Sequence, residues 1–325
     1  MNIQLALIRR LAIAGLACLP LNAMAQDNWP SKSITIIIPA APGGTTDIVG
    51  RMISEPLAKE LGQTVVIENK AGAAGIIGSQ SLIRSKPDGY TLIMGNIGPN
   101  AINYSLYKDL PYKKEDFIPI TNVISVPNVL VVNEATPVNN VQELLTYVAS
   151  DPKNQTFGSS GKGQSPHMSG ELFMQRGNIK AEHISYKGAG PAVAALLANQ
   201  FTFMIDNLPS SLTHIKSGKL KALAVTSDKR VADLPDVPTM KEAGVDNMVV
   251  TAWFGLFAPA GTPDDVVNKI HAAAKKVLES DNIKERFAQL GGEAGGNSPA
   301  EYAEYVKSQQ EMWADIVKTA NINMD

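Results

Sequence analysis

The feature that most constrains the fold is a repeated unit of an apolar strand-like run, a glycine-rich turn and a helix-like segment. Its first copy leads from "SITIIIP" through "AAPGGTTD" into an amphipathic stretch at 48–61, which ends at Gly62. "TVVIEN" and "YTLIMG" are further strand-like runs, with a helix predicted at 76–84 between them. Strands that alternate with helices over short connections are typical of an α/β fold, so we expect one wound sheet here.

A second series of these units begins near Val129. The strand "VLVVN" precedes a helix predicted at 141–149. Three more strand–loop–helix units follow, in "QTFGSSGKGQSPHMSGELFMQRG", "AEHISYKGAGPAVAALLANQ" and "FTFMIDNLPSSLTHIKSGK", before the strand "LKALAVT". This series predicts a second α/β domain.

The C-terminal region has one long apolar strand, "VVTAWFGLFAP", and then three predicted helices, at 263–279, 282–290 and 299–319. Thr262 is the expected N-cap of the first of these helices. Ser298 and Glu301 have the spacing of a capping box at the start of the third.

One strand and three helices do not easily form a sheet of their own, so we expect them to complete the first domain. The predicted domain 1 therefore comprises 26–125 and 248–325, and domain 2 comprises 126–247. The chain then crosses between the domains twice. This arrangement predicts a ligand cleft between two domains, spanned by two hinge crossovers.

The N-terminus has the pattern of an export signal. Two arginines, an apolar run and an Ala-Met-Ala site predict a signal peptide over 1–25, cleaved after Ala25, and a periplasmic location. The apolar run is shorter than the ~20 residues that a membrane-spanning helix needs. The arginine pair leaves Sec and twin-arginine export both open. Cys18, the only cysteine, lies in the signal, so the mature chain has no cysteine.

Composition excludes several classes of function. A formal net charge of −2 over 325 residues argues against a nucleic-acid-binding surface. The sequence has no HExxH spacing and no cysteine cluster. We therefore expect no metal and no cofactor.

The glycine-rich turn after the first strand is a candidate anion site. Gly43, Gly44, Thr45 and Thr46 place backbone amides at a predicted helix N-terminus, where unpaired N–H groups and the helix dipole favour negative charge. The turn matches neither the Walker pattern nor the dinucleotide fingerprint. A tight turn capped by Thr45 or Thr46 is the structural alternative.

A second candidate is "GSSGKGQSPH", whose hydroxyls and amides suit a carboxylate or a carbonyl. A surface loop with Ser165 as helix cap is the alternative. A catalytic serine is a third hypothesis, but the G-x-S-x-G elbow is only approached, and none of the four histidines has a recognisable triad context.

A third loop, "SYKGAGP", precedes a helix predicted from Pro191. Lys187 in this loop could pair with a ligand carboxylate or be solvated. Asp206 follows "FTFMI" at another strand end. Ligands of wound sheets bind outside the carboxyl ends of the strands, so these loops together predict one ligand site.

Almost the whole mature chain resembles the tripartite tricarboxylate transporter substrate-binding proteins, the Bug family. The blocks that carry the resemblance are, in order, "PAAPGGTTDIVGR", "VIENKAGAAGIIG", "PDGYTLIMG", "YKGAGPAVAALLANQ", "FMIDNLPSSLTHIKSGKLKALAVTS", "DVPTMKEAG" and "WFGLFAPAGTP". The resemblance implies a type II-like periplasmic binding protein, monomeric and without catalytic activity. It would carry a small carboxylate to membrane transporter subunits. A protein that feeds a signalling receptor remains an alternative, because it would use the same cleft.

The resemblance also implies where the ligand binds. The loop after the first strand would hold one carboxylate through backbone groups and waters, and the loops of the other domain would meet the rest of the ligand. The residues expected at the ligand are Pro39, Ala40, Ala41, Gly43, Gly44, Thr45, Asp47, Asn96, Ser159, Ser160, Gly161, Gly163, Ser165, His167, Tyr186, Lys187, Gly188, Ala189, Gly190 and Asp206.

One position departs from the family pattern. The family usually has an aromatic residue after the proline of the first strand, and this chain has Ala40 there. If this side chain lines the pocket, the pocket is larger or offers less stacking, which leaves the identity of the acid open.

Overall fold

The computed structural model describes residues 29–319. The predicted signal peptide and its cleavage site lie outside this range. The first part of the chain forms β1 (Ile34–Ile38), α2 (Thr45–Leu61), β2 (Val65–Asn69), η1 (Ala73–Gly75), α3 (Ile76–Ile83), β3 (Thr91–Asn96), η2 (Gly98–Ile102), α4 (Asn103–Leu106) and η3 (Lys114–Asp116).

The middle of the chain continues the alternation of strands and helices. It forms β4 (Phe117–Asn133), α5 (Val141–Ser150), η4 (Pro152–Asn154), β5 (Thr156–Ser159), α6 (Ser165–Gly177), β6 (Glu182–Ser185), α7 (Ala189–Leu197), β7 (Phe203–Asn207), α8 (Leu208–Lys216) and β8 (Leu220–Val225). The last part forms β9 (Thr251–Pro259), α9 (Asp264–Glu279), α10 (Asp281–Ala288), β10 (Glu293–Ala294) and α11 (Pro299–Thr319).

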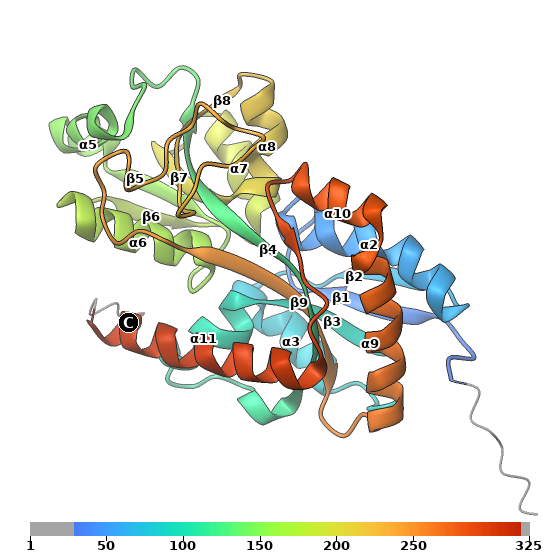
Figure 1. Cartoon of the computed structure of the whole chain (residues 1–325). Coiled ribbons are helices and arrows are strands. Elements are labelled where there is room, and N and C mark those ends of the chain that lie inside the picture. The colour runs from blue at the N-terminus through green and yellow to red at the C-terminus, as the bar shows by residue number, and fades with distance from the viewer. Residues whose placement is uncertain (1–28, 320–325) are drawn as a thin grey trace, which may run out of the picture.

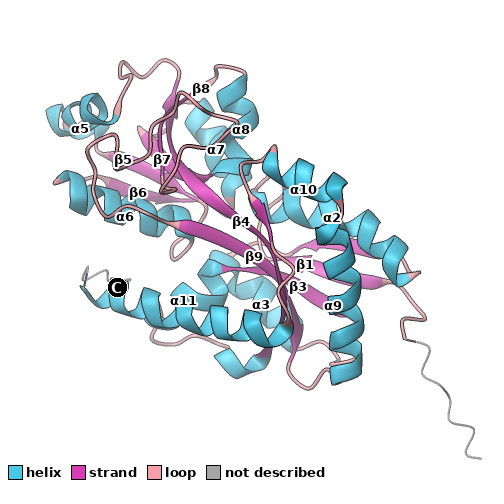
Figure 2. Cartoon of the chain, viewed as in Figure 1, coloured by secondary structure: helices cyan, strands magenta, loops and turns pink. Residues whose placement is uncertain are grey.

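The strands form one hydrogen-bonded series that runs through both halves of the molecule. Its order is β2-β1-β3-β9-β4-β7-β5-β6, and β8 and β10 also pair with β4. The strands β1, β2 and β3 are parallel, as are β5, β6 and β7, whereas β9 is antiparallel to both β3 and β4. The predicted mixed α/β fold is confirmed, and helices cover both faces of the strands in each half (Figure 2).

The strand β4 belongs to both halves. It pairs with β9 from Phe117 to Pro127, and with β7 and β8 from Asn128 onward. Figure 1 shows β4 and β9 side by side through the middle of the molecule. The expected start of a strand near Val129 was therefore 12 residues too late, because two prolines and several polar residues obscure the first part of β4. The domain boundary at 125/126 stays a prediction, and the strand partners change two residues after it.

Each half has apolar side chains on both faces of its strands. In β1, Ile36 and Ile38 pack with residues of α2 and α9, whereas Ile37 packs on the opposite face in a cluster that includes Trp313 of α11. In the other half, the same alternation along β4 places Leu130 in the cluster with α5 and α6, and its neighbours in the cluster with α7 and α8. The three C-terminal helices thus pack on the first half.

Several helix starts differ from the predictions, and α2 begins at Thr45 and not at Ile48. Thr262 does not cap α9, because its hydroxyl donates to the carbonyl of Pro259 (2.8 Å) and Pro263 is the N-cap. The helix α7 begins at Ala189 and not at Pro191, since a proline in the first turn needs no N–H. The capping box of α11 is confirmed, with the Ser298 amide donating to Glu301 Oε2 (2.8 Å) and the Glu301 amide donating to Ser298 Oγ (3.3 Å).

This capping box yields a prediction for stability. Ser298→Ala should lower the free energy of unfolding by about 1 kcal/mol, because the Glu301 amide loses its acceptor and the Glu301 carboxylate loses one of its two donors. The matched control is Ser308→Ala in the same helix, which removes an exposed hydroxyl bonded to the carbonyl of Tyr305. This control should stay within about 0.5 kcal/mol of the wild type in urea denaturation. Equal losses in both variants would contradict the cap assignment.

Candidate solute site between the two halves

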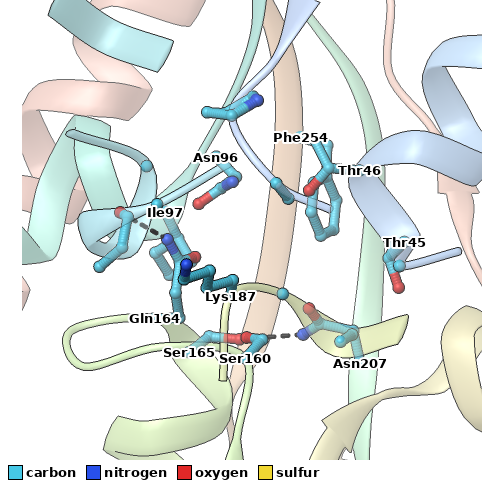
Figure 3. Close-up of a pocket in the computed structure, with 18 residues that line it drawn as sticks. Thr45, Thr46, Asn96, Ile97, Ser160, Gln164, Ser165, Lys187, Asn207 and Phe254 are labelled. Carbon is cyan, nitrogen blue, oxygen red and sulfur yellow. Dashed lines mark hydrogen bonds between the residues drawn. The ribbon is translucent and has the colours of Figure 1, made fainter. Parts of the chain in front are cut away.

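A cavity lies where the loops of the two halves meet. The free volume inside it is about 30 Å³. Its lining comes from both halves, with Thr45, Thr46 and Asn96 on one side and Ser160, Ser165 and Asn207 on the other (Figure 3). The complete lining is Pro39, Ala40, Gly44, Thr45, Thr46, Gly72, Ala74, Gly75, Asn96, Ile97, Ser160, Gln164, Ser165, Lys187, Gly188, Ala189, Asn207 and Phe254.

Five helices in the described part of the chain begin at this cavity. Their N-cap residues all line it, and none of these helices has a side-chain cap hydrogen bond. The N-caps are Gly44 of α2, Gly75 of α3, Gln164 of α6, Gly188 of α7 and Asn207 of α8. The first amides of a helix have no partner within it, and its N-terminus carries partial positive charge. The cavity is therefore suited to an anion.

Asp47 stabilises the loop after β1 on the side away from the cavity. Its carboxylate accepts hydrogen bonds from the Gly43 amide (3.1 Å), Arg51 Nε (2.9 Å) and Asn69 Nδ2 (2.9 Å). Burial acts to raise the pKa of Asp47, but the hydrogen bonds from Arg51 and Asn69, together with the Gly43 amide and the arginine charge, outweigh it and lower the pKa. The carboxylate therefore stays ionised and holds the turn, although it does not line the cavity.

The two halves touch directly at the rim of the cavity. The Ala41 amide donates to the carbonyl of Lys187 (3.1 Å), and Gln164 Nε2 donates to the carbonyl of Ala74 (2.8 Å). A β-carbon built on Gly190 would lie 2.3 Å from the carbonyl oxygen of Pro42. The loops "AAPGG" and "KGAG" thus form two opposed jaws in contact, and only glycine fits at position 190 in this arrangement.

The two adjacent serines of the Gly/Ser loop, Ser159 and Ser160, have different surroundings. Ser160 lines the cavity, whereas Ser159 is fully buried and lies 2.6 Å from Nε2 of His183. The ring of His183 lies on His167, with centroids 4.1 Å apart. Burial lowers the pKa of His183 to about 3, with the charges of His167 and Lys162 acting in the same direction. The serine that has a histidine partner is therefore not the serine at the cavity.

Several other predicted residues form hydrogen bonds within or near this loop, outside the cavity lining. The Gly163 amide donates to His167 Nδ1 (3.2 Å), and the Gly161 amide donates to Ser159 Oγ (3.1 Å). The Tyr186 hydroxyl donates to Gln200 Oε1 (3.3 Å). None of these four predicted residues, Gly161, Gly163, His167 and Tyr186, is in the cavity lining.

Asp206 is fully buried beside the cavity and does not line it. Its Oδ2 accepts hydrogen bonds from the hydroxyls of Ser210 (2.5 Å) and Ser211 (2.7 Å). The next residue, Asn207, does line the cavity and donates to Ser165 Oγ (2.9 Å). The expected contact point at this strand end is thus displaced by one residue, because successive side chains of a strand point to opposite sides.

Half of the predicted residues therefore lie in the cavity lining, and the others support it. Those in the lining are Pro39, Ala40, Gly44, Thr45, Asn96, Ser160, Ser165, Lys187, Gly188 and Ala189. Those outside it are Ala41, Gly43, Asp47, Ser159, Gly161, Gly163, His167, Tyr186, Gly190 and Asp206. Contact of any of them with a ligand stays a prediction.

Some lining residues were not among the predicted ones. Gly72, Ala74 and Gly75 come from the loop between β2 and α3, whose strand, glycine-rich turn and helix repeat the pattern of the first loop. That pattern could have identified them. Phe254 comes from the middle of β9, and its sequence context does not distinguish it from a core residue.

Within residues 29–319, no cluster of three or more histidine, cysteine, aspartate or glutamate side chains is placed to hold a metal ion. None of the helices described there combines the length and the apolar character needed to cross a membrane.

The sequence profile of the "Tripartite tricarboxylate transporter family receptor" matches residues 49–322. The chain is 36% identical to the protein BugT of Bordetella pertussis over 310 residues, covering 95% of this chain and 94% of BugT. It is 34% identical over 321 residues to a protein of Pseudomonas sp. strain P51 encoded between tcbD and tcbE, covering 97% and 95% of the two chains.

Solved structures with the same fold include two with bound acids. One is a protein of R. palustris with adipate, with a TM-score of 0.88 and 34% identity, covering 91% of this chain and 99% of that one. Another is MatC of Rhodopseudomonas palustris with bound malate, with a TM-score of 0.85 and 32% identity over 89% and 100% of the chains. The periplasmic binding protein BugD matches with a TM-score of 0.87 and 36% identity over 91% and 99%. These matches confirm the predicted resemblance and the two-domain fold, and the chain belongs to the tripartite tricarboxylate transporter receptor family of periplasmic binding proteins.

Proposed function

We propose that this protein captures a small organic carboxylate in the cavity between its two halves and delivers it to a tripartite-type membrane transporter. The observation that carries this proposal is the convergence of five uncapped helix N-termini on one cavity. Such ends bind anions through backbone amides and the helix dipole. Carboxylates are favoured because two structural relatives are described with adipate and with malate.

The side chains in the lining complement the amides. Asn96 offers its side-chain N–H donors and Ser160 a hydroxyl, whereas Asn207 offers only its amide oxygen as an acceptor, because both of its N–H groups donate to Asn128 and Ser165. Ile97 and Phe254 give the cavity apolar surface between these polar groups. A ligand with an ionised group and a short hydrocarbon part fits this lining. Lys187, the only lysine or arginine in the lining, is exposed and would act at the entrance.

Domain closure is the second part of the proposal. In an open form the jaws would separate, and solute would enter along the loop after β1. Closure would bring the amides of α6, α7 and α8 onto the solute and replace its water by preformed donors. The hydrogen bonds from Ala41 to Lys187 and from Gln164 to Ala74 belong to the closed form.

We further propose that no bond of the solute is broken. Ser160 has no histidine partner among the described hydrogen bonds, and the buried pair of Ser159 and His183 lies behind the lining. A histidine whose pKa is about 3 is a weak general base at neutral pH. Export of the chain by a leader at 1–25, a monomeric state and contact with membrane subunits complete the proposal.

A thermal-shift screen of residues 26–325 tests the ligand class. The panel is adipate, malate, citrate, glutamate, benzoate and nicotinate, with the neutral diamides of adipate and malate as matched controls. An acid at ~100 times its dissociation constant should stabilise the protein by ~2.7 kcal/mol, and the corresponding diamide should not, because it lacks the charge that the helix ends favour. Lack of a shift with every acid, or equal shifts with acid and diamide, would reject the carboxylate assignment.

Gly190→Ala tests closure. Its added methyl group would meet the carbonyl oxygen of Pro42 in the closed form, but alanine is a better helix former than glycine. We expect the affinity for the acid identified above to fall by about tenfold or more, equivalent to ~1.4 kcal/mol, while the unliganded protein unfolds at the wild-type temperature or above. Calorimetry measures both quantities.

The control for this variant is Ala189→Gly, which removes a methyl group from the same jaw. Its affinity should stay within a few-fold of wild type, since it introduces no clash across the jaws. Wild-type affinity in Gly190→Ala would mean that the jaws do not meet when solute is bound.

A further inference from the structure

Asp206 is a buried carboxylate that the proposed binding mechanism does not use. It is 0% exposed, and both of its serine hydrogen bonds end on Oδ2. Its other oxygen, Oδ1, is buried and has no hydrogen-bond partner among the described residues. Burial raises the pKa of Asp206 to about 6, against the opposing hydrogen bonds of Ser210 and Ser211. The group can therefore change its protonation state near neutral pH.

No described positive charge balances this carboxylate. The strands β4 and β5 and the helix α7, which pack against β7, contain no aspartate, glutamate, histidine, lysine or arginine. Most ionisable groups on the other packed elements have partners elsewhere: Asp47 pairs with Arg51, His167 with Glu171, Lys216 with Asp233, Lys59 with Glu55 and Glu60 with Lys276, and Lys221 donates to the carbonyl of Thr136. Arg176 is exposed, His214 is half-buried in the last turn of α8, and Lys187 lies at the cavity entrance. Burial and hydrogen bonds alone account for the state of Asp206.

A short chain of hydroxyl groups connects Asp206 to the cavity. Ser210 Oγ lies 2.5 Å from Asp206 Oδ2, and Thr45 Oγ1, which belongs to the opposite half and lines the cavity, lies 3.4 Å from Ser210 Oγ. Asp206 also lies just before α8, whose N-cap Asn207 is in the lining. A solute carboxylate in the cavity and the Asp206 carboxylate would therefore share the positive end of α8 and repel each other in a closed site.

We propose that capture of a carboxylate solute is coupled to the uptake of one proton from solvent by Asp206. The proton would bind at Oδ1, the oxygen without a partner, so that both serine hydrogen bonds to Oδ2 remain. No other bond forms or breaks. The inference rests on the proposed function, since it requires an anionic solute.

The direction of the pH effect follows from the sign of this coupling. A second negative charge raises the pKa of Asp206 above its value of about 6 in the free protein. Binding then takes up protons between the free and the bound pKa values. Affinity should rise as the pH falls through this window and level off below pH ~6, with a slope of at most tenfold per pH unit.

The first measurement uses the unliganded protein. Infrared difference spectra of wild type minus Asp206→Asn, recorded from pH 4.5 to 8, should contain the C=O band of a protonated carboxylic acid with a midpoint near pH ~6. Asparagine keeps an oxygen that can accept the two serine hydrogen bonds. Absence of this band over the whole pH range would overturn the assignment of Asp206 as the titrating group.

The second measurement is titration calorimetry at pH 7 in phosphate and in Tris, whose ionisation enthalpies differ. The ligand is the acid with the largest thermal shift in the panel above. The binding enthalpies should differ between the buffers by an amount that corresponds to uptake of a fraction of a proton, up to one. This difference should vanish in Asp206→Asn and persist in His167→Gln, a control for the nearby histidine pair.

Ser210→Ala gives an independent arm in case Asp206→Asn does not fold. Loss of a hydrogen bond that favours the ionised form should move the pH of maximal proton uptake upward. A histidine-based linkage would leave this pH unchanged and disappear in His167→Gln, which would refute the inference. An acid that binds with equal enthalpy in both buffers would also refute it while leaving the proposed function intact, whereas failure of every acid to bind refutes the proposed function itself.

Discussion

The continuity of β4 is the constraint on which the rest of the structure depends. A single 17-residue strand supplies the hydrogen-bonding edge for β9 in one half and for β7 and β8 in the other. Relative motion of the two halves would therefore bend or twist β4 where its partners change, between Pro127 and Asn128. Proline has no N–H to donate to a neighbouring strand, and Pro127 stands where β4 changes its partner from β9 to β7.

Asn128, the first residue after this change of partners, is hydrogen-bonded to Asn207 in the cavity lining. Its side chain accepts a hydrogen bond from Asn207 Nδ2 (2.6 Å) and donates to Ser169 Oγ (2.9 Å), while its backbone amide donates to Thr226 Oγ1 (2.8 Å). Thr226 in turn donates to the carbonyl of Val250 (2.6 Å), just before the chain returns in β9. A buried network with satisfied partners fixes geometry tightly. Hydrogen bonds thus connect Asn207 of the cavity lining to both segments that cross between the halves, at Asn128 and at Val250.

The sequence predicted the elements and the loops better than the roles of individual side chains. Periodicity and capping residues were sufficient for α11, because Ser298 and Glu301 interact locally. The long strand β4 was missed in part, since a strand that changes partners carries prolines and polar residues that ordinary strands lack. Asp47 and Asp206 were expected at the ligand, but burial and tertiary hydrogen bonds, which no local pattern encodes, place them behind the lining.

Ala40 and Phe254 both line the cavity, although they lie far apart in the sequence. Ala40 contributes only a methyl group to the lining. The lining nevertheless contains the ring of Phe254, which comes from β9, the strand that returns from the other half. Both residues belong to the same apolar cluster on the β1 side of the sheet. In the proposed function, the aromatic surface that would contact the hydrocarbon part of the solute is therefore that of Phe254, on a strand next to β4.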